Sequence, residues 1–272
     1  MRRIARHFAW LVAVALAVRA GGVARAAVLA HDDASDPAYN AGWTNGSNGG
    51  TGFAPWVLIP QPANNGAGHF IGSSANNGDG GANAPPAGDI DVAGEAWGMY
   101  ANGGNITEAR RPFTGALSPG QHLRFFFDNG WIDDGGTDAF FLGGDRLAFR
   151  FEGGRQNYEL DDNSGPIDTG ITFTDEGLLI DFALTGADTY ALSVTPAGST
   201  PRVFTGDLMG SPGVGIDAVS FFNASAGSFS QRDLFINSLA IVPEPPAAGL
   251  LAFAVTLMRR RSRDREGATK VT

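Results

Sequence analysis

The stretch Arg146-Leu147-Ala148-Phe149-Arg150-Phe151-Glu152 decides the fold class. Leu147, Phe149 and Phe151 fall on one face of an extended chain, and the charged residues Arg146, Arg150 and Glu152 fall on the other. A β-strand points successive side chains to opposite faces of its sheet. The stretch therefore predicts a strand with one face in a core and the other in solvent.

Short apolar or alternating runs bounded by Gly, Asp or Asn continue on both sides of this stretch. They predict strands at residues 53–59 (interrupted by Pro55), 69–71, 95–100, 122–127, 156–160, 178–184, 189–194, 202–208, 218–223 and 234–242. In the last run, Leu234 and Ile236 are followed by Leu239 and Ile241, which indicates a change of register near Asn237-Ser238.

Residues 31–88 are rich in Gly, Asn, Ser and Pro and read as loops. Trp43, Phe53, Trp56 and Phe70 within them are expected to attach these loops to a core.

No segment between the termini has a helical apolar stripe, and the 39 glycines suit many tight turns. We expect an all-β fold: one antiparallel β-sandwich, jelly-roll-like, with an N-terminal signal helix and a short C-terminal hydrophobic helix. The expected parts are a signal peptide at 1–26, the sandwich at 27–242 and a sorting or anchor segment at 243–272. Two small sandwiches divided near residues 115–120 are the alternative.

The N-terminus has the layout of an export signal. Arg2, Arg3 and Arg6 precede an apolar run at residues 8–18, and Ala24-Arg25-Ala26 offers a cleavage site between small residues. We expect the chain to be exported, with cleavage at this site or elsewhere between residues 20 and 27; a retained anchor is the alternative.

The C-terminus has a matching three-part layout. Pro243-Glu244-Pro245 precedes an apolar run at residues 247–258 and then Arg259-Arg260-Arg261. As a helix, twelve residues would span about 18 Å, which is short for a bilayer core of about 30 Å. The arginines would remain cytoplasmic, which leaves the preceding chain outside. A plain C-terminal anchor or a buried helix is the alternative.

This tail resembles the PEP-CTERM sorting signal of Gram-negative bacteria over about the last thirty residues, with Pro243, Glu244 and Pro245 as its motif; residues 262–272 extend past the usual end of the pattern. The resemblance implies an exosortase-type processing enzyme as partner. It also implies a transient inner-membrane association through the C-terminal helix, followed by release to the cell surface or the extracellular matrix. Through Gly52-Phe53-Ala54-Pro55-Trp56 and Asp128-Asn129-Gly130-Trp131-Ile132-Asp133, the body resembles other exported proteins with this tail, and that likeness implies no activity.

The exported part is strongly acidic. The whole chain carries −9, whereas residues 27–258 carry about −18, from 8 basic and 26 acidic residues with no lysine. Nucleic acid and anionic lipid would be repelled by this charge, so neither is expected as a partner. The chain has no cysteine, which excludes disulfides and thiolate metal sites.

The densest acidic loop is residues 128–138. Hard cations such as Ca²⁺ take about six to eight oxygen ligands, so Asp128, Asp133, Asp134 and Asp138 are candidate Ca²⁺ ligands. The spacing differs from that of an EF-hand, and ordinary acidic turns are the alternative.

Glu159 and Asp161 invite comparison with a glycosidase, because residues two apart on a strand share a face. Their pattern resembles half of the acidic strand motif of laminarinase-like enzymes, and Asn163-Ser164 stands where the second glutamate would be. No Gly-x-Ser-x-Gly elbow, HExxH motif or P-loop occurs in the sequence. We therefore assign no catalytic residue.

Exposed indoles can stack on sugar rings while nearby polar groups bond the hydroxyls. Trp131 lies inside the acidic loop and Trp97 next to a glycine-rich turn, so both are candidate ligand-binding residues. The leading hypothesis is a non-enzymatic β-sandwich at the cell surface or in the matrix that binds extracellular polysaccharide. A glycan-cleaving enzyme and a purely structural surface protein are the alternatives.

Overall fold

A computed structural model describes residues 28–60, 66–77 and 90–243, which hold fifteen strands and three short 3-10 helices. The strands are β1 Ala30–Asp32, β2 Val57–Ile59, β3 Ala67–Gly72, β4 Ala96–Ala101, β5 Ile106–Pro112, β6 Gln121–Asn129, β7 Thr137–Leu142, β8 Leu147–Glu152, β9 Asn157–Asp162, β10 Gly165–Thr172, β11 Leu178–Leu184, β12 Thr189–Pro196, β13 Arg202–Asp207, β14 Ala218–Ala224 and β15 Leu234–Pro243. The helices are η1 Pro37–Tyr39, η2 Ser74–Asn76 and η3 Ser230–Arg232. The two expected terminal helices lie outside the described residues.

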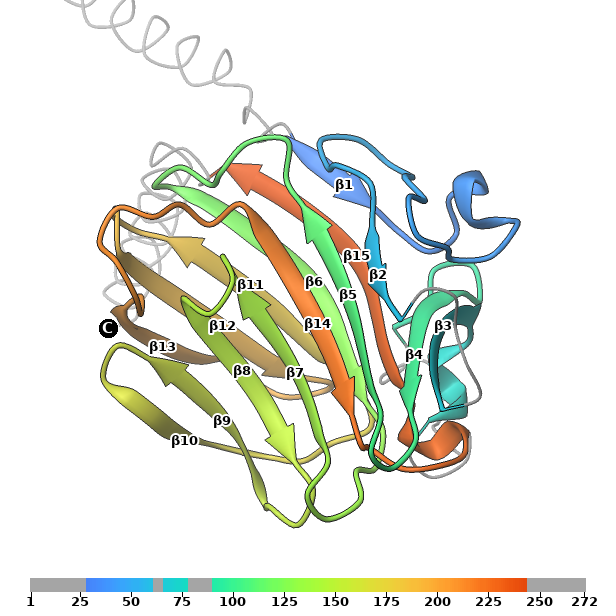
Figure 1. The fold of residues 1–272 in the computed structure, drawn as a ribbon. Coiled ribbons are helices and arrows are strands. Elements are labelled where there is room, and N and C mark those ends of the chain that lie inside the picture. The colour runs from blue at the N-terminus through green and yellow to red at the C-terminus, as the bar shows by residue number, and fades with distance from the viewer. Residues whose placement is uncertain (1–27, 61–65, 78–89, 244–272) are drawn as a thin grey trace, which may run out of the picture. The chain divides into compact units, whose positions relative to one another are not determined.

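The strands form two antiparallel sheets (Figure 1). The first sheet has the order β13-β12-β11-β6-β15-β4-β3, with β1 also paired to β15. The second has the order β10-β9-β8-β7-β14-β5-β2. The expectation of an antiparallel fold in two sheets is therefore confirmed.

Strands from before and after residues 115–120 are neighbours in both sheets. β4 pairs with β15 in the first sheet, and β5 pairs with β14 in the second. A division into two small sandwiches at this point is therefore wrong. Val28–Pro243 forms one compact unit.

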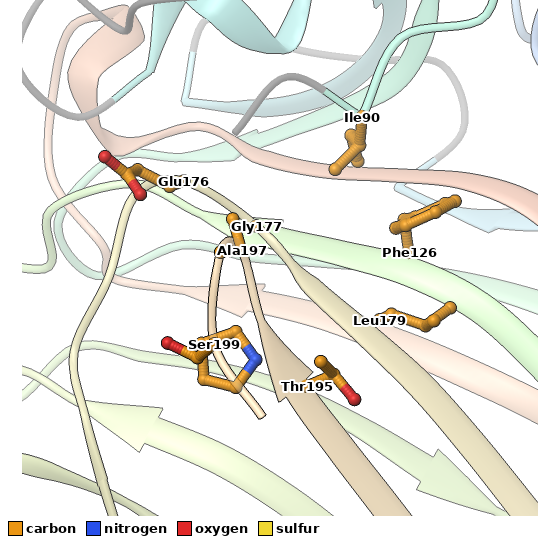
Figure 2. A pocket seen from close by; sticks show the side chains of 10 residues that line it. Ile90, Phe126, Glu176, Gly177, Leu179, Thr195, Ala197 and Ser199 are labelled. Carbon is orange, nitrogen blue, oxygen red and sulfur yellow. The ribbon is translucent and has the colours of Figure 1, made fainter. Parts of the chain in front are cut away.

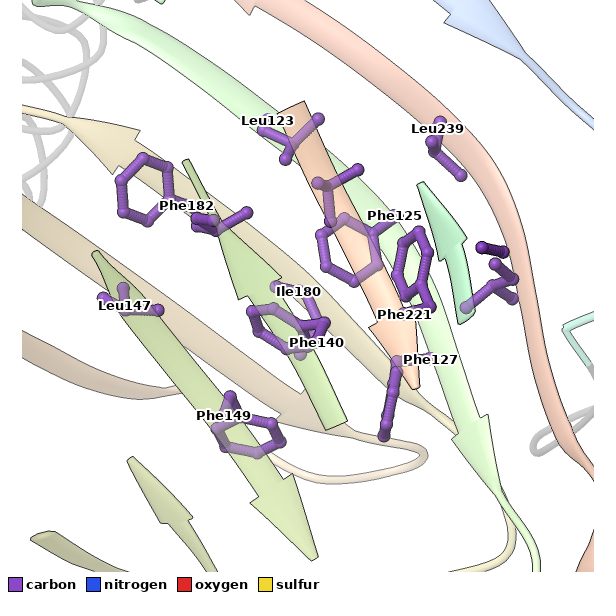
Figure 3. Packing of buried hydrophobic residues seen from close by; sticks show 14 of the residues in the cluster. Leu123, Phe125, Phe127, Phe140, Leu147, Phe149, Ile180, Phe182, Phe221 and Leu239 are labelled. Atoms are coloured by element: carbon purple, nitrogen blue, oxygen red, sulfur yellow. The ribbon is translucent and has the colours of Figure 1, made fainter. Parts of the chain in front are cut away.

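The core lies between the two sheets and is dominated by phenylalanine (Figure 3). The ring of Phe140 on β7 lies 5.0 Å from that of Phe125 on β6 and 5.3 Å from that of Phe149 on β8. All three side chains are fully buried. The contact of Phe140 with Phe125 joins the two sheets, and burial of one such side chain stabilises the fold by roughly 1.5–3 kcal/mol.

The core face predicted for β8 is confirmed, because Leu147, Phe149 and Phe151 are buried. The opposite face is less open than predicted, since Arg146 and Ala148 are buried and Arg150 and Glu152 are half-buried. The register change predicted in β15 is also found. Its pairing with β6 shifts between Asn237 and Ala240, and Ser238 takes a φ of 55° there. This bulge lets the buried residues on both sides of it face the same core.

Four strands were not predicted from the sequence: β1, β5, β7 and β10. β5 carries Arg111, which is fully buried and forms an ion pair with Asp32 at 2.6 Å. β7 begins in the acidic loop, and β10 at the sheet edge contains Pro166 and Gly170. These polar and turn-forming residues interrupt the apolar alternation on which strand prediction depends.

The N-terminal loops are attached to the core by aromatic residues, as expected. Trp43 and Trp56 are buried, with ring centroids 5.0 Å apart, and Trp56 lies 5.2 Å from Trp97 on β4. Phe53 is also buried, and Phe70 packs against a second, smaller apolar cluster.

Candidate functional site

Trp131 lies on the loop that follows β6, and backbone hydrogen bonds hold this loop in place. The N–H of Trp131 donates to the carbonyl of Gln231 at 2.8 Å, and that of Asp133 donates to the carbonyl of Ala226 at 2.9 Å. A side chain at Gly130 would place its Cβ 2.3 Å from the Gln231 oxygen. Glycine is therefore required for this close approach of the two loops.

The indole of Trp131 is the most accessible of the tryptophan rings in the described residues. Its residue is 54% exposed, whereas Trp43, Trp56 and Trp97 are buried. Phe173 contacts it edge to face with ring centroids 6.2 Å apart, and Phe173 packs on Phe151 at 4.9 Å. The ring is thus supported from the core side while it remains open to solvent.

Asp133 lies on the same loop as the indole, and Arg232 reaches it from η3. Arg232, next to β15, donates to Asp133 at 2.7 Å, and both side chains are partly exposed. We refer to Trp131, Phe173, Asp133 and Arg232 together as the Trp131 platform. It combines an open aromatic ring with a carboxylate and a guanidinium, which are the groups that a sugar ring and its hydroxyls can engage.

The structure does not bring the four predicted metal ligands together. Asp133 is paired with Arg232, and Asp134 lies on the exposed turn. Asp128 and Asp138 are buried in β6 and β7, which belong to different sheets. Across the described residues, no three His, Cys, Asp or Glu side chains are grouped as a metal site.

Trp97 does not have the accessibility expected of a ligand-binding residue. It lies on β4 with 0% exposure, in contact with Trp56 and Tyr39. The expectation of a ligand site at Trp97 is corrected on this ground: its side chain faces the core, where it packs against other aromatic rings.

Glu159 and Asp161 share the outer face of the second sheet, as their spacing predicts. Arg150 on β8 contacts both: it lies 2.9 Å from Glu159 and also forms an ion pair with Asp161. Its Nε atom lies 3.0 Å from Glu152. One guanidinium therefore occupies the space between the two carboxylates, and the group is an ion-pair network.

A small pocket opens on the outer face of the first sheet (Figure 2). Phe126, Leu179 and Thr195 lie on adjacent strands at its floor, and Ile90 and Glu176 lie at its rim. Its volume is about 160 Å³. Glu176 is the one charged residue in its lining, so it offers little for recognition of a polar ligand.

The predicted sorting motif lies at the boundary of the described residues. Pro243 is the last residue of β15, and Glu244 and Pro245 lie beyond it. Within 28–60, 66–77 and 90–243, no helix has the length and apolar character needed to cross a membrane.

Phe173 and Arg232 were missed at the sequence level. Each is separated from Trp131 by at least forty residues of chain, and neither belongs to a motif. Pairing of β6 with β15, and packing of β8 against the segment after β10, bring them together. A contact map would have been the signal required to find them.

No protein-family model matches the sequence. No curated protein matches it either. Among solved structures, the chain is similar to a conserved carbohydrate esterase from the Shiga toxin-encoding bacteriophage phi24B, with 14% identity and a TM-score of 0.50 over 81% of this chain and 100% of the other.

Weaker similarities include a glycosyl hydrolase family 16 protein from Mycobacterium smegmatis, with 11% identity and a TM-score of 0.43 over 79% of this chain and 100% of the other. Domain 4 of the GH43 extracellular arabinanase from Geobacillus stearothermophilus has 15% identity and a TM-score of 0.42 over 80% and 93%. At such identities the esterase similarity is one of fold, and the two weaker ones carry no argument.

Proposed function

We propose that this protein is a non-enzymatic, polysaccharide-binding β-sandwich and that the Trp131 platform is its binding site. The observation that carries the proposal is the 54% exposure of Trp131 on a loop fixed by backbone hydrogen bonds. A solvent-open indole held in one place loses little conformational entropy when a ring stacks on it. A phage carbohydrate esterase has a similar fold, but the choice of ligand rests on Trp131.

The acidic body narrows the choice of polysaccharide. Residues 27–258 carry about −18, so a neutral chain is favoured over an anionic one. Asp133 can accept hydrogen bonds from sugar hydroxyls, and Arg232 can donate them. We also infer that the interleaving of early and late strands in both sheets is of the jelly-roll kind.

The proposal includes the location of the protein. The N-terminal signal and the Pro243-Glu244-Pro245 tail support export, processing by an exosortase-type enzyme and transient association with the inner membrane. The mature protein would then act at the cell surface or in the extracellular matrix. The fate of Glu244 variants in cells tests this part separately.

Trp131→Ala tests the binding site. Affinity for neutral soluble polysaccharides, measured by affinity electrophoresis across a panel of glucans, xylans and arabinans, is expected to fall about tenfold, because a stacking contact of about 1.4 kcal/mol corresponds to that factor. Wild-type fluorescence should shift to the blue on binding, since Trp131 is the exposed indole in the described structure.

Val203→Ala is the matched control. Val203 is 62% exposed on the edge strand β13, away from Trp131 in the sheet order, and its loss should leave affinity unchanged. Equal affinity of Trp131→Ala and the wild type, or binding to none of the panel, would contradict the proposal. If the wild type binds none of the panel, the alternative of a purely structural surface protein is favoured.

A further inference from the structure

Apolar rows on two neighbouring strands end in polar residues at one end of the sandwich interior. On β7 the buried row is Leu142, Phe140 and Asp138, and on β14 Val219 and Phe221 are followed by Asn223. The two strands pair with Asn223 directly opposite Asp138. Both side chains therefore point from the same face of the second sheet into the space between the sheets.

Asp138 and Asn223 have oxygen atoms without partners. Both residues have 0% exposure, and neither carboxylate oxygen of Asp138 has a hydrogen-bond partner among the described residues. The Nδ2 of Asn223 donates to the carbonyl of Arg232 at 3.0 Å, while its Oδ1 has no partner. Buried polar atoms are almost always paired, because each unpaired one is costly.

Asp233 brings a second carboxylate to this place. It lies between η3 and β15, directly after the Arg232 carbonyl that holds Asn223. Burial raises the pKa of Asp233 to about 7, and its charge adds to the burial that raises the pKa of Asp138. Within the described structure no hydrogen bond or ion pair engages the Asp233 carboxylate.

No ion pair among the described residues supplies a cation to either of these two carboxylates. Arg232 is the nearest basic residue in sequence, and its guanidinium is engaged by Asp133 at 2.7 Å. No lysine occurs before Lys270. The buried carboxylate of Asp138, the half-buried carboxylate of Asp233 and the inward amide oxygen of Asn223 thus form a set of oxygen donors without a basic partner among the described residues.

We propose that Asp138, Asp233 and Asn223 bind a Ca²⁺ ion at this end of the sandwich interior. A hard divalent cation prefers carboxylate and amide oxygens, and backbone carbonyls and water supply the rest of its six to eight ligands. Such a site needs only two carboxylates, so it agrees with the lack of any group of three among the described residues. The ion would cross-link β7, β14 and the start of β15.

This site differs from the calcium site that the acidic loop suggests. Asp138 is common to both, whereas Asp133 is paired with Arg232 and Asp134 lies on the exposed turn. The role of the ion is structural and is separate from polysaccharide binding, since Asp138 and Asn223 are fully buried whereas Trp131 is open to solvent.

Thermal unfolding of the purified full chain tests the proposal, with tryptophan fluorescence as the signal. After removal of divalent ions with EGTA, Ca²⁺ at 100 times its dissociation constant should raise the Tm by roughly 5–10 °C. Mg²⁺ at the same concentration should do much less, because it loses its water reluctantly. Isothermal titration should give a stoichiometry of one.

Asp138→Asn and Asp233→Asn should each abolish the Ca²⁺-dependent shift, and Asp134→Asn on the exposed turn should retain it. If Asp138 is instead buried as a neutral carboxylic acid, Ca²⁺ leaves the wild-type Tm unchanged and Asp138→Asn is harmless; that result overturns the proposal. A Ca²⁺ shift that survives Asp138→Asn would overturn it as well.

Asn223→Asp keeps the test decisive if the Asp138 variant does not fold. The proposal expects this variant to bind Ca²⁺ more tightly than the wild type and to be less stable in EGTA, because a third carboxylate joins the set. Unchanged or absent Ca²⁺ binding in Asn223→Asp would contradict the assignment. No polysaccharide enters these measurements, so their outcome is independent of the Trp131 test.

Discussion

His69 on β3 is a half-buried histidine that the fold keeps neutral. Its Nε2 lies 2.9 Å from the carbonyl of Glu108, so this nitrogen carries the hydrogen and donates it. The other ring nitrogen is buried without a partner, and Trp43 contacts the ring with centroids 5.2 Å apart. Burial lowers the pKa of His69 from 6.5 to about 4.

The first prediction concerns this residue and pH. The unfolded chain takes up the proton near pH 6.5 and the folded chain near 4, so the stability contribution of His69 is complete above 6.5 and is lost as the pH falls. The loss at pH 4 should be about 3 kcal/mol. His69→Gln, which can still donate to Glu108, should lose less stability than the wild type between pH 7 and pH 4.

Urea unfolding at several pH values measures this difference, and the exposed His31→Gln serves as the control. The control should follow the wild-type pH dependence. Identical pH dependence in His69→Gln and the wild type would show that the His69 ring does not remain neutral in the folded chain.

At the scale of one element, β15 depends on the side chain of Asn237 at its bulge. The Oδ1 accepts from the N–H groups of Ala34 at 3.1 Å and Ser238 at 2.9 Å. The Nδ2 donates to the carbonyls of Ile90 at 3.1 Å and Glu95 at 2.7 Å. One fully buried amide thus joins β15 to the N-terminal segment and to the loop before β4.

Asn237→Ala should therefore lower the free energy of unfolding by about 3 kcal/mol or more, because several buried backbone groups lose their partner. Asn157→Ala on β9, where the side chain bonds only Asp168 at the surface, should change it by less than about 0.5 kcal/mol. Equilibrium unfolding in urea compares the two. A decrease in the free energy of unfolding below about 1 kcal/mol for Asn237→Ala would contradict the prediction. It would mean that water satisfies the backbone groups in place of the amide.

At the scale of the whole molecule, the sandwich is one core built from distant parts of the chain. β6 lies between β11 and β15, and β14 lies between β5 and β7. Either sheet therefore requires both halves of the sequence, and Asp32 near the N-terminus is paired with Arg111 inside. The last strand ends at Pro243, where the proposed sorting motif begins.

The prediction at this scale concerns the fate of the whole chain in cells. In a host with an exosortase-type enzyme, the wild type should lose its C-terminal segment and leave the inner membrane. Glu244→Ala should keep the segment and remain in the membrane fraction, because the enzyme would no longer recognise the motif. Fractionation followed by mass spectrometry measures both the position and the mass of the chain.

Asp264→Ala, beyond the arginine cluster, is the control and should be processed normally. Release of Glu244→Ala at the wild-type rate would contradict the sorting proposal. It would not affect the binding or calcium proposals, whose residues all lie within the sandwich.

Local alternation was sufficient to predict most strands. β8, β11 and β15 were predicted from rows of apolar residues two apart, and the bulge at Asn237-Ser238 was visible as a shift of that row. The spacing of two also places Asn223 in the inward row of β14, after Val219 and Phe221. Asn223 is thus a polar residue at a core position.

The candidate sites were only partly predictable, because they join residues that are far apart in the chain. The acidic loop pointed to Trp131, whose exposure the structure bears out, and to Asp138, but also to Asp133, which is paired with Arg232. Trp97 lies close to glycines in the sequence, which suggested an exposed turn. Packing between the two sheets buries it instead.

By itself, the sequence determined that the protein is built of antiparallel strands, that its body is acidic and free of cysteine, and that its ends have the layout of export and sorting signals. These properties depend on composition and on short-range periodicity, which are local. Only the tertiary structure decided which aromatic ring is open, which carboxylates are buried, and which of them lack a basic partner. Those properties depend on pairing between strands that lie more than a hundred residues apart in the chain. No local sequence pattern encodes that pairing.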